Sequence, residues 1–248
     1  NPTVVNNVET IATVPWIINN SGDDYAKIGI GRSTGTKLIS ASGHIKNPGV
    51  YEIELGLSVY EFMNSDEYLG GMSSDRPLKA FVPGGSSVPV LPANLIYKTA
   101  AGEDRLMTYE SLSDGGFATG SMLGSGGFIV YNDTACIVRN TWNFSRFYHH
   151  ESCGQCTPCR EGTGWLEKVL HRIENGHGRE EDIELLLSIQ SKIEGNTICP
   201  LGDAASWPVA AAIRHFRDEF EWHVKNPELS QTSNFGLQHY ADPIHVPA

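Results

Sequence analysis

Four of the five cysteines in this 248-residue chain follow a pattern that could bind an iron–sulfur cluster. Cys153, Cys156 and Cys159 are separated by two residues each in SCGQCTPCREG, and Cys199 lies far downstream, directly before a proline. Three thiolates on a tight loop can bind three corners of a cubane, and a distant fourth completes the set. This spacing is typical of [4Fe–4S] ligands. Gly154 lets the backbone approach the cluster closely.

Zinc and disulfides are the two alternatives for these cysteines. Structural zinc sites usually combine two Cys-x2-Cys pairs, whereas this chain has a single triplet. Neighbouring thiols can also oxidise to disulfides, but a disulfide framework is normally denser and even-numbered. The pattern therefore favours an iron–sulfur cluster over both alternatives.

Other residues that could do chemistry have simpler structural interpretations. Cys136 is expected to lie inside an apolar helix as a small buried hydrophobe. His149 and His150 are expected at a helix C-terminus, where they interact with the helix dipole, and tuning of the cluster is the alternative role. The glycine-rich stretches Ser121–Gly127 and Val82–Pro89 are predicted to be structural loops, because neither has the ending of a phosphate-binding loop.

Composition excludes several classes of function. The chain is 40% hydrophobic and 19% charged, which is typical of a globular protein. Its formal net charge of -11 argues against a nucleic-acid partner, which needs a clustered positive field. No stretch approaches the roughly 20 apolar residues of a membrane span, so any membrane link is expected to run through a partner. The chain begins NPTVV without a leader or a methionine, and we expect it to be a processed or excised piece of a longer protein.

The first half of the chain predicts the end of one domain and a small α+β domain. Residues 1–30 contain one apolar helix, expected to be interrupted by Pro15, which belongs to a domain whose bulk lies upstream. Residues 31–132 alternate with period two around a turn at Asn47–Gly49, and Ser58 is predicted to cap a short helix. Strands around one short helix indicate a β-grasp (ubiquitin-like) domain.

The second half predicts a four-helix bundle over residues 133–226. Asp133 is predicted to cap the first helix, Pro158 suits the first turn of the second, and Pro208 is tolerated only near the start of the last. Residues 227–248 are polar and without periodicity, and we expect them to wrap a neighbour or stay mobile. The predicted class is α+β.

Four stretches resemble one protein family, in the same order and over nearly the whole chain. They are NPTVVNNVETIATVP, VPGGSSVPVLP, RFYHHESCGQCTPCREGT and IEGNTICPLGDAASWPV. They are similar to the NADH-binding flavoprotein subunit of respiratory complex I, the NADH:quinone oxidoreductase. In that family NADH gives a hydride to FMN, and a [4Fe–4S] cluster takes electrons from the flavin one at a time.

This resemblance implies a flavin domain, a β-grasp domain and a helical bundle, with the cysteine triplet and Cys199 as the cluster ligands. The glycine-rich flavin loop and the NADH-holding residues of the family are absent from this chain, so it is expected to lack a complete NADH site. Pro200 stands where many members have alanine, and a proline cannot offer its amide to the flavin. The residues that the resemblance places at the flavin are Val5, Asn6, Asn7, Thr10, Pro200 and Leu201.

The resemblance also implies a setting. The expected partners are a thioredoxin-like [2Fe–2S] subunit and a large multi-cluster subunit, in a cytoplasmic or mitochondrial-matrix arm peripheral to the inner membrane. The alternatives are the diaphorase subunit of an NAD-linked hydrogenase or formate dehydrogenase and, from another class, an interaction module held together by zinc.

Overall fold

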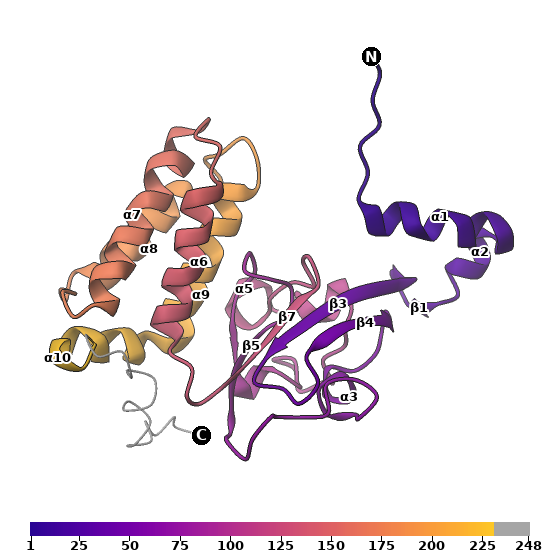
Figure 1. Ribbon diagram of the computed structural model, residues 1–248, viewed down its shortest axis with the longest axis horizontal. Coiled ribbons are helices and arrows are strands. Elements are labelled where there is room, and N and C mark those ends of the chain that lie inside the picture. Colours follow the sequence, from indigo (N-terminus) through magenta and orange to yellow (C-terminus); the bar gives the residue numbers. More distant parts are fainter. Residues whose placement is uncertain (231–248) are drawn as a thin grey trace.

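The computed structural model describes residues 1–230, and most of the predicted polar tail, 227–248, lies outside the described residues. Two short helices, a mixed sheet and a helical region follow one another along the longest axis (Figure 1). The predicted α+β class is confirmed. Within residues 1–230, no helix combines the length and apolar character that a membrane crossing demands.

The N-terminal region consists of helices α1 (Val8–Asn20) and α2 (Gly22–Tyr25) and the paired two-residue strands β1 (Gly29–Ile30) and β2 (Ser33–Thr34). The expected interruption at Pro15 is wrong, because α1 continues through this residue. Pro15 leaves the carbonyl of the preceding turn without its intrahelical partner. No residue of α1 is buried, so water can satisfy that carbonyl.

A five-stranded sheet forms the middle of the molecule, with strand order β4-β3-β7-β5-β6. The central pair β3–β7 is parallel and the other neighbours are antiparallel. The turn predicted at Asn47–Gly49 and the cap at Ser58, whose side chain accepts from the amide of Glu61, are confirmed. The elements are β3 (Thr36–Gly43), β4 (Gly49–Glu54), α3 (Val59–Asn64), β5 (Leu78–Val82), β6 (Leu91–Pro92), the 3-10 helix η1 (Ala93–Leu95), α4 (Tyr109–Leu112), α5 (Gly116–Thr119) and β7 (Gly127–Asn132).

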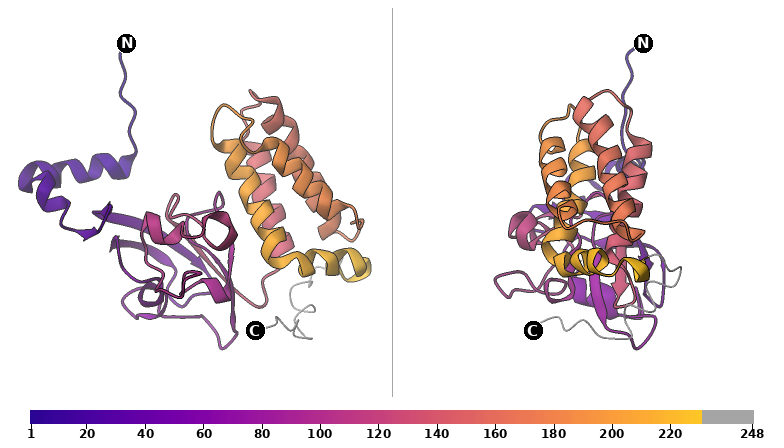
Figure 2. Two further views of the ribbon diagram at one scale, coloured as in Figure 1. Left: turned by 180° about the vertical axis from the view of Figure 1, so that it is seen from behind. Right: turned by 90° about the vertical axis from the view of Figure 1, so that its left-hand side faces the viewer.

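Strand β5 is buried on both faces and therefore joins two cores. Phe81 points into the core of the sheet region, where it contacts Phe128. Ala80 and Val82, on the opposite face, belong to the apolar core of the helical region. The helices thus lie against this face of β5, and the left view of Figure 2 shows the helical region beside the sheet.

The two glycine-rich loops pack against each other beside this sheet. The amide of Ser125 donates to the carbonyl of Gly84 over 2.9 Å, and the amide of Gly85 donates to the carbonyl of Gly127 over 2.6 Å. A Cβ added to Gly84 would lie 2.3 Å from the carbonyl oxygen of Met122. The structure therefore supports the interpretation of both stretches as structural loops.

Four helices in mutual contact follow the sheet, and α10 (Pro227–Ser230) ends the described chain. The cap predicted at Asp133 is wrong: Asp133 forms an ion pair with Arg76, and Cys136 is the residue before the first helix. Pro208, expected near the start of the last helix, lies in its third turn. The four helices are α6 (Ile137–Glu151), α7 (Thr157–Glu174), α8 (Asp182–Ile193) and α9 (Leu201–Lys225).

Candidate iron–sulfur centre

The four cysteines of the motif lie at one end of the helical region. Cys153 follows the end of α6, Cys156 is the N-cap of α7, and Cys159 lies in the first turn of α7. Cys199 directly precedes Pro200, the N-cap of α9. The chain leaves α6, turns, returns along α7, and later starts α9 at this same end (Figure 1). We name the segments 152–159 and 194–200 the first and second cysteine loops.

A backbone hydrogen bond connects the two cysteine loops. The amide of Ile198 donates to the Sγ atom of Cys156 over 3.3 Å. Within the first loop, the hydroxyl of Ser152 lies 3.2 Å from the Sγ atom of Cys159. Donors of this kind stabilise the negative charge on sulfur and tune iron–sulfur centres. The contact between Ile198 and Cys156 joins residues that are 42 positions apart in the sequence.

The conformation of each loop depends on small residues and backbone contacts. Gly154 adopts φ +78°, a left-handed conformation that suits glycine, and its carbonyl accepts from the side chain of Arg160 over 2.8 Å. In the second loop the carboxylate of Asp203 accepts from the amide of Gly195 over 2.7 Å. The hydroxyl of Thr197 donates to the carbonyl of Cys199 over 2.9 Å. Both loops are thus fastened to the helices that they precede.

Two helix N-termini point their positive ends at the cysteine loops. Neither α7 nor α9 has a side-chain hydrogen bond at its N-cap. Their first amides therefore remain available, and the dipole of each helix favours negative charge there. A [4Fe–4S] cluster held by thiolates is anionic, so this placement stabilises it.

The chemistry and exposure of the thiols fit an iron–sulfur cluster. All five cysteines are free, so no disulfide competes for the sulfur atoms. Cys159 is buried, Cys156 is half-buried, and Cys153 and Cys199 are exposed. Four soft thiol donors with amide and hydroxyl donors beside them suit such a cluster. The exposed side offers an edge at which electrons could enter or leave.

The histidine pair lies in the last turn of α6, as predicted. The Nδ1 atom of His149 lies 2.5 Å from a carboxylate oxygen of Glu167, which connects α6 to α7. A Cβ added to Gly164 would lie 3.0 Å from the Nε2 atom of His149, so the glycine leaves space for the ring. His150 is exposed and lines a surface cavity of about 650 Å³ with Phe147.

The structure separates the two groups of predicted flavin residues. Val5, Asn6, Asn7 and Thr10 are all exposed, and the side chain of Asn7 accepts from the amide of Glu9 as the N-cap of α1. Pro200 and Leu201 lie at the start of α9. Figure 1 shows α1 and α9 on opposite sides of the sheet. The segment of residues 1–30 therefore does not meet the cysteine loops in this chain.

Two features of the centre were missed by sequence reasoning. The Ile198 amide could not be predicted from the side-chain pattern, because every residue except proline has a backbone N–H group. The hydroxyl of Ser152 adjoins the first cysteine, so the signal was present but unspecific.

The chain is similar in sequence to known proteins over most of its length. Residues 139–223 match a family described as the NADH-ubiquinone oxidoreductase-F iron-sulfur binding region. The F subunit of the NADH-quinone oxidoreductase of Rickettsia typhi (strain ATCC VR-144 / Wilmington) is 45% identical over 226 residues, 91% of this chain and 51% of that protein. The F subunit of the Mycobacterium tuberculosis enzyme (strain ATCC 25618 / H37Rv) is 45% identical over 224 residues, 90% of this chain and 47% of that protein. The chain thus spans about half the length of the curated relatives it matches.

The chain is also similar to a solved structure over most of its length. A chain of an NAD+-reducing [NiFe]-hydrogenase, in the H2-reduced state, superposes with a TM-score of 0.75 and 30% identity over 90% of this chain and 35% of that chain. The fold and the two cysteine loops define a protein with an iron–sulfur binding region. The chain belongs to the family of the NADH-quinone oxidoreductase F subunits, and it corresponds to their C-terminal portion. The predicted family is confirmed.

Proposed function

We propose that this chain passes single electrons from a flavin to the next cluster of an NADH-quinone oxidoreductase, through one [4Fe–4S] cluster. Cys153, Cys156, Cys159 and Cys199 would hold the cluster. The observation that carries the proposal is the hydrogen bond from Ile198 to the Cys156 sulfur, because it holds the second cysteine loop against the triplet.

The residues of this chain have three tasks in such a relay. The cluster, when bound, supplies one-electron redox chemistry between a two-electron donor and single-electron acceptors. The Ile198 amide donates to the Cys156 sulfur, and the Ser152 hydroxyl would donate to the Cys159 sulfur once this is a cluster-bound thiolate. Both hydrogen bonds would stabilise added negative charge. The N-termini of α7 and α9 act in the same direction. The buried Cys159 would hold the inner side of the cluster, and the exposed Cys153 and Cys199 would hold its outer side.

The flavin and NADH sites require more than this chain. The proposed FMN contacts, in a longer subunit where the N-terminal segment would lie closer to the start of α9 than it does here, are Val5, Asn6, Asn7, Thr10, Pro200 and Leu201. NADH is the proposed substrate. Helix α1 has no buried residue, and its apolar side chains Val8 and Ile18 are 83% and 77% exposed. Such a helix fits a larger flavin domain that covers it.

The finer architecture is part of this proposal. We assign residues 1–30 to the flavin domain, 31–132 to a β-grasp domain, 133–226 to a four-helix bundle and 227–248 to a tail. The sheet order with its parallel central pair supports the second assignment, and the mutual contacts of α6 to α9 support the third. The proposed neighbours are a thioredoxin-like [2Fe–2S] subunit and a large multi-cluster subunit, in an arm peripheral to the inner membrane.

The experiment is anaerobic quantitation of iron and sulfide with EPR of the dithionite-reduced chain. We expect about four irons and four sulfides per chain and an S = 1/2 signal. Cys199→Ser should lose most of the iron, whereas Cys136→Ser is the matched control, because Cys136 lies at the other end of the helices and should leave the iron content unchanged. Zinc without sulfide in the unmodified chain would refute the relay and support a zinc-held interaction module.

A second candidate is the diaphorase subunit of an NAD-linked hydrogenase or formate dehydrogenase. The superposition on an NAD+-reducing [NiFe]-hydrogenase favours it. The two candidates share the same cluster and differ in the electron acceptor. Purification of the native complex, followed by assays of quinone reduction and of hydrogen- and formate-dependent NAD+ reduction, distinguishes them.

A further inference from the structure

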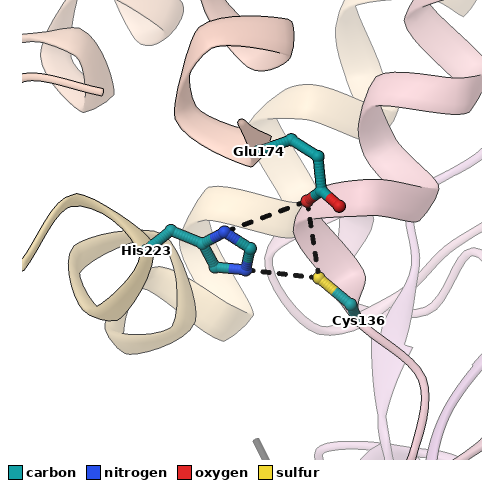
Figure 3. Close-up of side chains that lie close together, drawn as sticks. All are labelled: Cys136, Glu174 and His223. Atoms are coloured by element: carbon teal, nitrogen blue, oxygen red, sulfur yellow. Dashed lines mark hydrogen bonds and ion pairs between the residues drawn. The ribbon is translucent and has the colours of Figure 1, made fainter. Parts of the chain in front are cut away.

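Three chemically different side chains meet at the end of the helical region opposite the cysteine loops. Cys136 is the N-cap of α6, Glu174 ends α7, and His223 lies in the last turn of α9. Figure 3 shows all three pointing toward one another. The Sγ atom of Cys136 lies 3.3 Å from the Nε2 atom of His223 and 3.8 Å from the Oε2 atom of Glu174. The Nδ1 atom of His223 lies 3.8 Å from the same oxygen.

These atoms match the ligand chemistry of zinc. Thiolate sulfur, imidazole nitrogen and carboxylate oxygen bind zinc at about 2.3, 2.0 and 2.1 Å, so two tetrahedral ligands lie about 3.4–3.6 Å apart. The separations of 3.3 and 3.8 Å in this cluster bracket that range. One atom from each of the three residues falls within 4.8 Å of the others. A small shift would accommodate an ion among them.

The surroundings hold the ligand atoms as a metal site requires. The amide of Arg139 donates to the Cys136 sulfur over 3.3 Å and so fixes its position at the start of a 15-residue helix. The guanidinium of Arg139 lies 2.8 Å from the Oε1 atom of Glu174 and leaves Oε2 facing the other two residues. Partners of this kind orient metal ligands.

A second charged pair borders the cluster. The carboxylate of Glu219 accepts from the amide of Ile137 over 2.8 Å and lies 2.9 Å from the ammonium group of Lys79 on β5. Glu219 therefore compensates Lys79 and caps α6. This pair therefore leaves Glu174 as the carboxylate that faces Cys136 and His223.

Without a cation, this cluster is costly. Cys136, Glu174 and His223 are only 6%, 2% and 0% exposed. Enclosed polar groups are costly unless each of them finds a partner. One divalent ion would be a common partner for all three, and its binding displaces the ligand protons.

The same three residues could also be a catalytic triad, with Cys136 as the nucleophile, His223 as the base and Glu174 as the acid. Their burial argues against catalysis. A catalytic cysteine needs access for a substrate. Here all three side chains are enclosed. A site that holds something permanently fits this environment better.

We propose that Cys136, Glu174 and His223 bind one divalent ion of the zinc class. The ion fastens the start of α6 to the ends of α7 and α9, and the thiol proton passes to solvent as the metal–sulfur bond forms. This site goes beyond the electron relay and does not depend on it, because it shares no residue with the cysteine loops.

Zinc binding by the chain with its iron–sulfur cluster in place tests this site, with Zn²⁺ alone as the probe. X-ray absorption at the zinc edge separates zinc from iron. We expect one zinc per chain in addition to the iron, with one sulfur neighbour at about 2.3 Å and nitrogen or oxygen neighbours at about 2.0–2.1 Å. Zinc surrounded by four sulfurs would instead place it at the cysteine loops. That result, or a chain that binds no zinc, would overturn the assignment.

Substitutions make the test specific. Cys136→Ser, Glu174→Gln and His223→Gln should each weaken zinc binding about 100-fold or more, since loss of an outer partner alone costs 10–100-fold. His215→Gln is the matched control, because His215 lies on the same helix, is half-buried and is outside the cluster. Circular dichroism identifies folded variants. Equal zinc affinity in folded His223→Gln and His215→Gln chains would refute the site, whereas the iron content separately reports on the relay.

Discussion

The two ends of the helical region concentrate cysteine chemistry in opposite ways. The same three helices, α6, α7 and α9, meet at both ends. At one end, four thiols lie on loops, two of them exposed, beside uncapped helix N-termini. At the other, one thiol meets a histidine and a glutamate in a closed interior flanked by ion pairs. An electron relay needs an accessible edge, whereas a structural metal ion is held among ligands that are closed to solvent.

The largest expected effect separates the ends by their metals. Cys199→Ser should abolish most iron and sulfide binding, because the second cysteine loop supplies only this thiol. Zinc binding at the opposite end should persist in the same variant. Elemental analysis of the purified chain measures both. Retention of four irons by this variant would contradict the role of Cys199.

Asp182→Asn should destabilise the buried end by about 3 kcal/mol, because it leaves Arg172 without its carboxylate partner. Asp182 is fully buried and receives two hydrogen bonds from Arg172, one of them 2.6 Å long, which join α8 to α7. Urea unfolding measures the loss. Glu180→Gln, at an exposed position near the start of the same helix, is the control and should change little.

The same pair predicts a dependence on pH. Burial alone would raise the pKa of Asp182, but hydrogen bonds from Arg172 and from the Arg179 amide outweigh it and hold the pKa below 3.8. The stabilisation is therefore fully present above about pH 4 and is lost as pH falls through the lowered pKa. Urea unfolding curves measured between pH 2 and about 6 should show a smaller fall in the free energy of unfolding at low pH for Asp182→Asn than for the unmodified chain. An unchanged acid profile would contradict the assignment.

Zinc should stabilise the buried end in proportion to its affinity. At a free concentration of 100 times the dissociation constant, a ligand of the folded state adds about 2.7 kcal/mol to the free energy of unfolding. Thermal unfolding of the cluster-loaded chain with and without Zn²⁺ measures this gain. The gain should disappear in His223→Gln and remain in His215→Gln, and equal gains in both would contradict a site at His223.

The smallest effect concerns the amide that joins the cysteine loops. Ile198→Pro removes the N–H that donates to the Cys156 sulfur. The cluster potential should become more negative, because the more highly charged reduced state loses a hydrogen bond. An EPR-monitored redox titration measures the midpoint. Ile198→Ala keeps the amide and should retain the original midpoint, so an equal shift in both variants would point to the side chain instead.

Local patterns predicted much of the fold. The hairpin turn at Asn47–Gly49, the cap at Ser58 and the start of α7 at Pro158 depend on neighbouring residues, and the structure confirms them. The failures at Pro15 and Asp133 have tertiary causes. An exposed helix tolerates an unsatisfied carbonyl, and Asp133 pairs with Arg76, 57 residues away, instead of capping α6.

The sequence by itself determined the family and the cysteine motif, because thiol type and spacing are local properties that survive in any correct fold. Only the tertiary structure decided that an amide of the second cysteine loop reaches Cys156. It also converted Cys136 from an expected small hydrophobe into one corner of a buried cluster with Glu174 and His223. Residues 38 and 87 positions away enter that cluster only when three helices pack together, since no short-range pattern encodes where distant helices end.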